Sequence, residues 1–176
     1  MILNSRIIGS SQKKIIILHG LLGSLDNWIT FGKKISNEGF EVHLVDQRNH
    51  GKSFHSNEFS YEHMANDLKN YFNHFNIEKA SIIGHSMGGL IATRLAVEKN
   101  ISLAGLVLSS CHLGFGLPKG QALMARYADR IDVLSKSNAD NTYAIKRAKR
   151  STPDGTPSYV IEFLADVAGS TRIEGI

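Results

Sequence analysis

Five short apolar or β-branched runs alternate with segments of helical spacing along this chain, and this alternation constrains the fold more than any other feature. The runs lie at about residues 2–8, 15–18, 41–45, 81–84 and 104–109. Strands that alternate with helices form a parallel sheet with helices packed on its faces. The sequence therefore predicts a single α/β sheet over the first two thirds of the chain.

The segments between the runs carry helix start and stop signals. Ser24 is the predicted N-cap of a helix that ends before Gly39, and Ser60 is the predicted N-cap of a second helix. A third helix is expected to begin directly after Ser86. The side chains predicted to face the sheet are Leu25, Trp28, Ile29, Ile35, Tyr61, Met64, Ala65, Leu68, Tyr71, Phe72, Phe75, Leu90, Ile91 and Leu95.

The pattern changes at residue 112, which we take as the boundary between a core (1–112) and a helical cap or lid (113–176). A loop rich in glycine opens the second part, which shows helical spacing and no strand pattern. In its last helix Thr156 is the predicted N-cap and Pro157 the first helical residue. The face predicted to pack inward comprises Tyr159, Phe163, Leu164 and Val167.

Composition places the chain among soluble globular proteins. It has 176 residues, 42% of them hydrophobic, with 20 Lys and Arg against 16 Asp and Glu. No apolar run approaches the roughly 20 residues of a membrane span, and the N-terminus lacks a signal-peptide pattern, so we expect a cytoplasmic protein without a membrane partner. The single cysteine, Cys111, excludes an internal disulfide. The basic residues are scattered except at 146–150, which indicates a solvated helix face and no nucleic-acid partner.

The segment Gly84-His85-Ser86-Met87-Gly88 follows a predicted strand and opens a predicted helix. This is the strand-turn-helix setting that a G-x-S-x-G elbow requires. Small residues at positions 84 and 88 allow a sharp turn that leaves the serine hydroxyl exposed and the next backbone N–H beside it. The segment predicts Ser86 as a nucleophile, with a glycine-rich turn and an incidental serine as the alternative.

Residues 19–23, with the sequence HGLLG, follow the run at 15–18. Their glycines let backbone amides face the space above the sheet, and the Leu21 N–H is the predicted partner of the Met87 N–H in an oxyanion hole. Each such donor contributes roughly 3 kcal/mol to transition-state stabilisation. We expect His19 to fix this loop by hydrogen bonding, and the polar segment at 46–53 to tie the neighbouring loops together.

Three segments, "HGLLGSLDNW", "DQRNHGKS" and "IIGHSMGG", resemble the α/β-hydrolase superfamily in residue type, order and spacing. They are most similar to its compact bacterial and mitochondrial esterase and thioesterase branch. The resemblance covers about residues 1–110 and implies an α/β-hydrolase fold with a helical cap. It also implies Ser86 as nucleophile, the backbone amides of Leu21 and Met87 as oxyanion hole, and an acyl ester or thioester as substrate. A serine at position 86 argues against the dehalogenase and epoxide-hydrolase branches, which place an aspartate there.

The resemblance breaks after the nucleophile. The superfamily orders its triad as serine, acid and histidine along the chain. Here His112 is the only histidine after Ser86, and Glu98, late in a predicted helix, is the only acid between them. Relatives also carry two further strands after the cap. The chain is therefore expected to be a C-terminally truncated form without its last two strands, with His112 as candidate base or as a polar residue of the cap hinge.

Three interpretations follow from the sequence. The first is a serine hydrolase of small acyl esters whose base and acid lie outside this chain. The second is a catalytically inactive fragment or binding module, for which the open sheet edge offers a route to self-association. The third is an active short hydrolase that uses His112. No cofactor and no metal are predicted, and cap residues such as Phe115, Leu117, Met124 and Tyr127 either line an acyl pocket or pack on the sheet.

Overall fold

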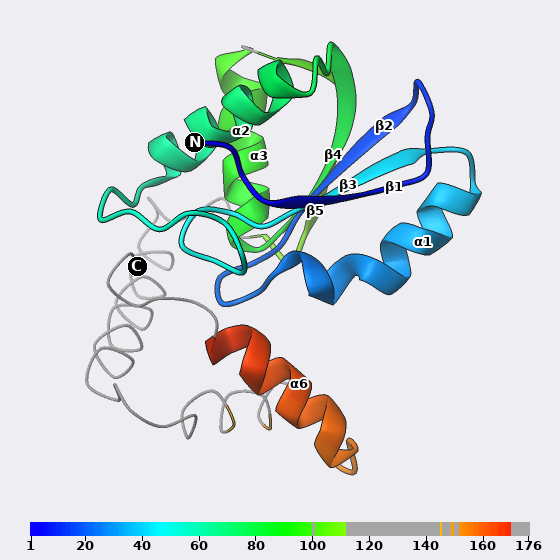
Figure 1. Ribbon diagram of the computed structural model, residues 1–176, viewed down its shortest axis with the longest axis vertical. Helices are drawn as coiled ribbons and strands as arrows, with labels where there is room; N and C mark the ends of the chain where they lie inside the picture. Colours follow the sequence, from blue (N-terminus) through cyan, green and yellow to red (C-terminus); the bar gives the residue numbers. More distant parts are fainter. Residues whose placement is uncertain (100, 112–144, 146–148, 150–151, 170–176) are drawn as a thin grey trace.

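The computed structural model describes residues 1–99, 101–111, 145, 149 and 152–169, and shows a five-stranded sheet with helices on both faces (Figure 1). The strands are β1 (Ser5–Ile8), β2 (Lys14–Leu18), β3 (Glu41–Val45), β4 (Lys79–His85) and β5 (Ser102–Ser109). The helices are the short 3-10 helix η1 (Leu25–Trp28), α1 (Ile29–Asn37), α2 (Tyr61–His74), α3 (Met87–Glu98) and α6 (Ser158–Gly169). Each predicted strand is present, which confirms the α/β fold class.

The strand order in the sheet is β1-β3-β2-β4-β5. Strands β2 to β5 run parallel, as predicted, whereas β1 lies antiparallel to β3 at one edge. The chain thus enters the sheet centre at β2, moves out to β3, crosses back to β4 and continues to β5. Within the described residues, β5 pairs with β4 alone and forms the other edge.

Burial on both faces explains why β2 is a continuous apolar run rather than an alternating one. Ile16 and Leu18 belong to the larger core, on the side covered by α2 and α3. Ile15 and Ile17 belong to a smaller core on the opposite side, covered by η1 and α1. The sheet is therefore the middle of three layers, with β2 at its centre.

The predicted N-caps Ser24 and Ser60 are confirmed. The Ser24 hydroxyl accepts a hydrogen bond from the Asp26 N–H at 3.2 Å, and the Asn27 side chain accepts one from the Ser24 N–H at 2.9 Å. The Ser60 hydroxyl accepts one from the His63 N–H at 3.2 Å. The predicted inward face of α2 is wrong at Tyr61, which is 42% exposed because it is the first residue of the helix and lies beyond the sheet.

Helix α6 begins at Ser158, so the predicted N-cap Thr156 and the predicted first helical residue Pro157 are each wrong by one position. The Pro157 carbonyl accepts the Val160 N–H at 3.0 Å, whereas the Thr156 hydroxyl donates to the Pro153 carbonyl at 2.7 Å and does not cap the helix. Val167 is buried as predicted, but Tyr159 is 71% exposed. Phe163 is exposed as well, so the predicted inward face is wrong in its first half. The remaining predictions for the cap, with Phe115, Leu117, Met124 and Tyr127, lie outside the described residues. None of the helices described combines the length and the apolar character that crossing a bilayer requires.

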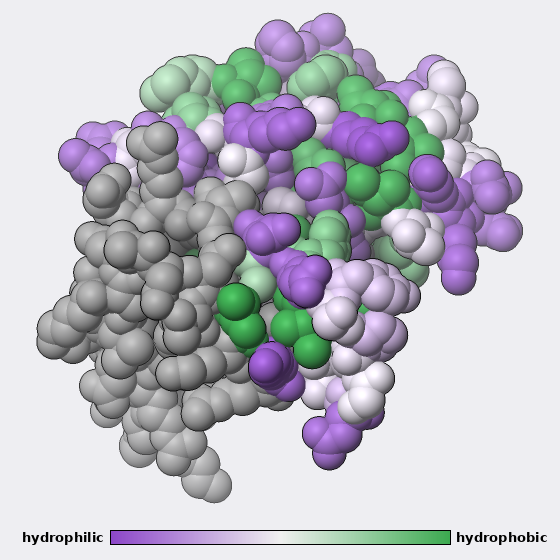
Figure 2. Space-filling model, turned by 60° about the horizontal axis from the view of Figure 1, so that its bottom comes forward, coloured by the Kyte–Doolittle hydropathy of each residue, from purple (hydrophilic) through white to green (hydrophobic). Residues whose placement is uncertain are grey.

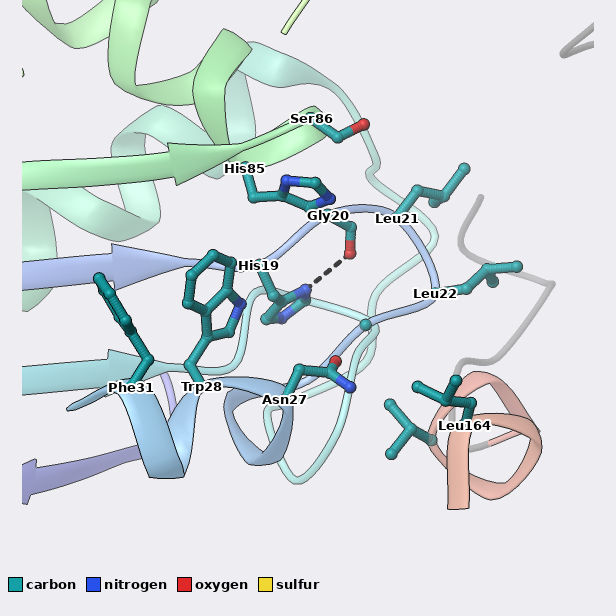
Figure 3. A pocket seen from close by; sticks show the side chains of 12 residues that line it. His19, Gly20, Leu21, Leu22, Asn27, Trp28, Phe31, His85, Ser86 and Leu164 are labelled. Carbon is teal, nitrogen blue, oxygen red and sulfur yellow. Dashed lines mark hydrogen bonds between the residues drawn. The ribbon is translucent and has the colours of Figure 1, made fainter. Parts of the chain in front are cut away.

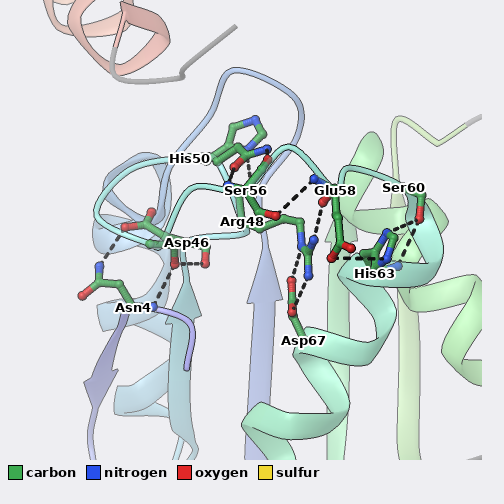
Figure 4. A network of polar contacts seen from close by, with 11 residues as sticks. Asn4, Asp46, Arg48, His50, Ser56, Glu58, Ser60, His63 and Asp67 are labelled. Atoms are coloured by element: carbon green, nitrogen blue, oxygen red, sulfur yellow. Dashed lines mark hydrogen bonds and ion pairs between the residues drawn. The ribbon is translucent and has the colours of Figure 1, made fainter. Parts of the chain in front are cut away.

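A buried ion pair ties the loop after β3 to helix α2. The Arg48 guanidinium donates from Nη2 to Asp67 Oδ1 at 2.8 Å and from Nε to Asp67 Oδ2 (Figure 4). A third donor, Nη1, is hydrogen-bonded to the Glu58 carbonyl, and the guanidinium carbon lies 5.5 Å from the centre of the Phe54 ring. Both charged side chains are less than a tenth exposed. The pair therefore holds this loop in one position against α2.

We expect Asp67→Ala to lower the free energy of unfolding by about 3 kcal/mol, because it leaves the buried Arg48 guanidinium without its counter-charge. The matched control is Glu62→Ala, which removes an exposed carboxylate 3.6 Å from Arg94 and is expected to cost less than about 1 kcal/mol. Urea denaturation of both variants measures the difference. Equal losses would show that the buried pair has no special role.

Candidate active site

The site lies where the connections of the sheet diverge. Strand β2 continues through η1 and α1 to β3, whereas β4 continues through α3 to β5, so the chain leaves these two neighbouring strands in opposite directions. In open α/β sheets such a divergence forms a crevice at the carboxyl ends of the strands, and ligands bind there. Leu18 of β2 pairs with Gly84 of β4, which places residues 19–23 beside Ser86.

Ser86 occupies a tight turn between β4 and α3, as the sequence predicts. Its backbone has φ 51° and ψ −114°, a conformation that costs a non-glycine residue about 1–3 kcal/mol. The turn is held by the Ser86 N–H, which donates to the Ser109 carbonyl at 2.9 Å, and by the Ser86 carbonyl, which accepts the Gly89 N–H at 3.0 Å. The side chain is half-buried and faces the space above the sheet (Figure 3).

Two glycines permit this turn. A Cβ at Gly84 would lie 2.6 Å from the Gly88 carbonyl oxygen, and a Cβ at Gly88 would lie 2.5 Å from the Leu18 carbonyl oxygen. A third glycine brings the loop after β2 against the serine, since a Cβ at Gly20 would lie 3.1 Å from that of Ser86. The predicted need for small residues at positions 84 and 88 is confirmed.

A hollow of about 420 Å³ opens in front of Ser86 (Figure 3). Its lining comprises residues 19–23 after β2, Asn27, Trp28 and Phe31 from η1 and α1, His85 and Ser86 from the elbow, and Leu164 and Val167 from α6. The predicted residues Ser86 and Leu21 both border the hollow. Met87 is the first residue of α3, where backbone N–H groups have no partner within the helix. His112, the candidate base, lies outside the described residues.

The buried imidazole of His19 fixes the loop after β2, as predicted. Its Nε2 accepts the Gln47 backbone N–H at 3.0 Å, which places the ring proton on Nδ1, and Nδ1 donates to the Gly20 carbonyl at 2.8 Å. Burial, with a smaller contribution from the nearby His50 imidazole, lowers the pKa of His19 to about 3. The ring is therefore neutral at pH 7, and both of its nitrogens are engaged.

His50 makes the same kind of link from the opposite side. Its Nε2 accepts the Leu22 backbone N–H at 3.2 Å, and its Nδ1 donates to the Arg48 carbonyl at 2.9 Å. Burial also lowers its pKa. Because both nitrogens of both rings are occupied by the backbone, neither His19 nor His50 is placed to accept the proton of Ser86.

The carboxylate of Asp46 gathers three chain segments (Figure 4). Oδ1 accepts the Leu25 N–H at 2.8 Å, while Oδ2 accepts the Asn4 side-chain amide at 2.8 Å and the Lys52 N–H at 3.0 Å. Gly51, at φ 54°, approaches so closely that a Cβ would lie 2.3 Å from the carboxylate. The predicted role of residues 46–53 in tying the loops together is thus confirmed.

Sequence reasoning missed part of the lining. Trp28 was interpreted as a core residue, and it does pack on the smaller core, but its ring also borders the hollow. His85 precedes Ser86 in the chain, the centre of its ring lies 5.9 Å from that of Trp28, and burial lowers its pKa. The sequence feature that could have indicated His85 as a lining residue is its position directly before Ser86 in the tight turn. Cys111, by contrast, is half-buried and packs against the first turn of α3, and burial raises the pKa of its thiol, which disfavours the reactive thiolate form.

We expect acidification to destabilise the protein through His19. In the unfolded chain its ring is protonated near its ordinary pKa of 6.5, whereas the folded ring is protonated only near pH 3. Between these values the unfolded state binds more protons, so the free energy of unfolding falls by about 1.4 kcal/mol per pH unit below pH 6.5. Urea denaturation at pH 6.5, 5.7 and 5.0 measures this slope.

The His19→Asn variant should be less stable at pH 7. Its free energy of unfolding should also depend less steeply on pH, by about 1.4 kcal/mol per pH unit. The control is His63→Asn, at an exposed histidine outside these loops, which should keep the slope of the unaltered protein. An unchanged slope in His19→Asn would contradict the role given to this ring.

Comparison with known proteins adds to this geometry. A protein-family model described as "alpha/beta hydrolase fold" matches residues 13–160. A putative esterase/lipase of Haemophilus influenzae is 41% identical over 81 residues, which cover 46% of this chain and 28% of that protein. An sn-1-specific diacylglycerol lipase of Danio rerio is 37% identical over 109 residues, covering 57% of this chain and 34% of that protein. The chain thus spans about a third of the length of these curated relatives.

Among solved structures, an esterase from a marine microorganism is similar to this chain with a TM-score of 0.71 and 31% sequence identity. The similarity covers 94% of this chain and 63% of that one. An esterase from Exiguobacterium antarcticum is similar in fold, with a TM-score of 0.82 at 20% identity.

Proposed function

The chain belongs to the alpha/beta hydrolase fold family, and on that premise we propose that it is a serine hydrolase that cleaves small acyl esters or thioesters through Ser86. The observation that carries the proposal is the position of Ser86. It lies on a strained turn at the point where the sheet connections diverge, and it borders a hollow of about 420 Å³. The esterase and lipase names of the relatives support the same reaction class.

In the proposed reaction the Ser86 hydroxyl oxygen forms a bond to the carbonyl carbon of the substrate, and its proton passes to a base. The negative charge that develops on the carbonyl oxygen is stabilised by the Leu21 and Met87 N–H groups. This assignment is supported by the contact between Gly20 and Ser86 and by the place of Met87 at the start of α3. The alcohol or thiol then leaves with a proton, and water hydrolyses the acyl-enzyme to release the acid and regenerate Ser86.

Neither His19 nor His50 is the base, because both ring nitrogens of each are hydrogen-bonded to the backbone. Within this chain His112 is the candidate. Otherwise the base lies outside this chain, which spans about a third of the length of the curated relatives. These two versions of the proposal predict different behaviour for a His112→Ala variant.

We expect a fluorophosphonate probe to label the folded chain at Ser86 and to leave the Ser86→Ala variant unlabelled, as measured by gel fluorescence and mass spectrometry. If His112 is the base, His112→Ala should lower ester turnover by about 10⁴-fold. If the base lies elsewhere, His112→Ala should be labelled and should turn over ester as the unaltered chain does. Absence of Ser86-dependent labelling in a sample with native circular dichroism would refute the proposed hydrolase.

The edge of the sheet supports a second proposal, a binding role through self-association. Leu106, Val107 and Leu108 of β5 are all exposed, and Val107 keeps 53% of its surface exposed. Within the described residues β5 has a strand on one side only. An exposed apolar edge strand pairs readily with another chain. We propose that two copies of this chain pair through antiparallel β5 strands about a two-fold axis.

We expect Val107→Lys to convert a dimer into a monomer, because it places charges of the same sign on both strands at the paired edge. Light scattering after size-exclusion chromatography measures the mass. The control is Val97→Lys, which is 74% exposed and belongs to helix α3 rather than to the edge strand, and it should leave the dimer intact. A monomeric unaltered chain would refute self-association.

A further inference from the structure

Three rings line one side of the hollow in a row that leads from the elbow to the surface. The Trp28 ring centre lies 5.9 Å from that of His85, at an angle of 59°, and 5.8 Å from that of Phe31, at 70°. His85 is adjacent to Ser86 in the chain, whereas Phe31 is 41% exposed. We call Phe31, Trp28 and His85 the aromatic wall (Figure 3).

Three leucines lie on the side of the hollow away from the aromatic wall, and Asn27 of η1 adds a polar group to the lining. Figure 3 shows Leu21, Leu22 and Leu164 on the side of the hollow away from Trp28 and Phe31. Among the described lining residues no side chain carries a full charge at neutral pH, since burial keeps the imidazoles uncharged. Figure 2, which looks at the molecule from the side of α6, shows small groups of hydrophobic side chains between hydrophilic ones. The hollow thus suits an uncharged, apolar group.

Packing on the core accounts for only part of the aromatic wall. Trp28 packs beside Leu25 and Ile29 on the smaller core, which explains one side of its ring. A single exposed phenylalanine such as Phe31 needs no special explanation. Three rings in a row do need an explanation, because together they present a continuous ring surface from the residue next to Ser86 to the exposed Phe31.

We propose that the aromatic wall binds the apolar chain of an uncharged ester whose carbonyl lies at Ser86, so that Phe31, Trp28 and His85 determine the specificity of the site. The proposal rests on the proposed function only for the position of the carbonyl. Each methylene that contacts the wall should tighten binding by about fourfold. A chain that extends past Phe31 enters solvent, so further methylenes should add nothing.

The experiment uses the fluorescence of Trp28, which is the only tryptophan in the chain and therefore reports on the aromatic wall alone. The probes are straight-chain primary amides from butanamide to dodecanamide, which are uncharged and are not esters. Each is titrated into the chain and into its Ser86→Ala variant. We expect a saturable change in Trp28 emission, tightening by about fourfold per methylene and then reaching a plateau. Octanoate, which carries a charge, should bind at least tenfold more weakly than octanamide.

Phe31→Ala tests the surface end of the wall. It should weaken binding of the longest amides by about tenfold and leave the shortest unchanged, because only long chains reach position 31. The matched control is Tyr61→Ala, an aromatic side chain of equal exposure (42%) on α2 that does not line the hollow, and it should change no affinity.

The outcomes separate this proposal from the proposed function. If the amides alter Trp28 emission in Ser86→Ala but the unaltered chain cleaves no ester, the aromatic wall stands and the hydrolase proposal fails. If Ser86 is labelled but no amide alters Trp28 emission, the hydrolase proposal stands and the wall is refuted. Equal affinities in Phe31→Ala and Tyr61→Ala, or equal affinities for octanoate and octanamide, would also refute the wall.

Discussion

The close approach of the first turn of α3 to the ends of β2 and β4 is the contact on which the site depends. A Cβ at Gly88 would lie 2.5 Å from a β2 carbonyl oxygen, so no larger residue fits without moving the helix or the strand. This packing forces the Ser86 backbone to φ 51°. The strain is maintained because the serine N–H is tied to the end of β5 and its carbonyl to the turn that follows. The positions of the Ser86 hydroxyl and of the Met87 backbone N–H at the start of α3 are therefore consequences of helix-to-sheet packing.

The loops around Ser86 are held by buried polar groups rather than by apolar packing. His19 and His50 each accept one backbone N–H and donate to one backbone carbonyl, and Asp46 accepts three donors from three segments. An imidazole accepts and donates at the same time only in its neutral form, and burial favours that form by lowering the pKa of both rings. The same residues that position the site thus make it sensitive to acid, and the Arg48–Asp67 pair fixes the remaining loop against α2.

Much of the fold was predictable from particular residues. The alternation of apolar runs with helical segments predicted the parallel sheet, and Ser24 and Ser60 marked helix starts that the hydrogen bonds confirm. The exposed positions of Tyr61 and Tyr159 were not predictable, because helical spacing defines a face but not how far the sheet extends beneath it. Trp28 was ambiguous for a related reason. Its spacing correctly placed it against the sheet, whereas the border it shares with the hollow depends on where the loop after β2 and helix α6 lie.

By itself the sequence determined the alternation of strands and helices, the turn around Ser86 and the glycines that turn requires, because these depend on neighbours a few residues apart. The tertiary structure alone decided the strand order, with β1 antiparallel at one edge, and so located the point where the connections diverge. It also decided that His19 and His50 are engaged by the backbone, and that Phe31, Trp28 and His85 form one row. Those contacts join segments up to about 60 residues apart, and local periodicity carries no information on which segments meet.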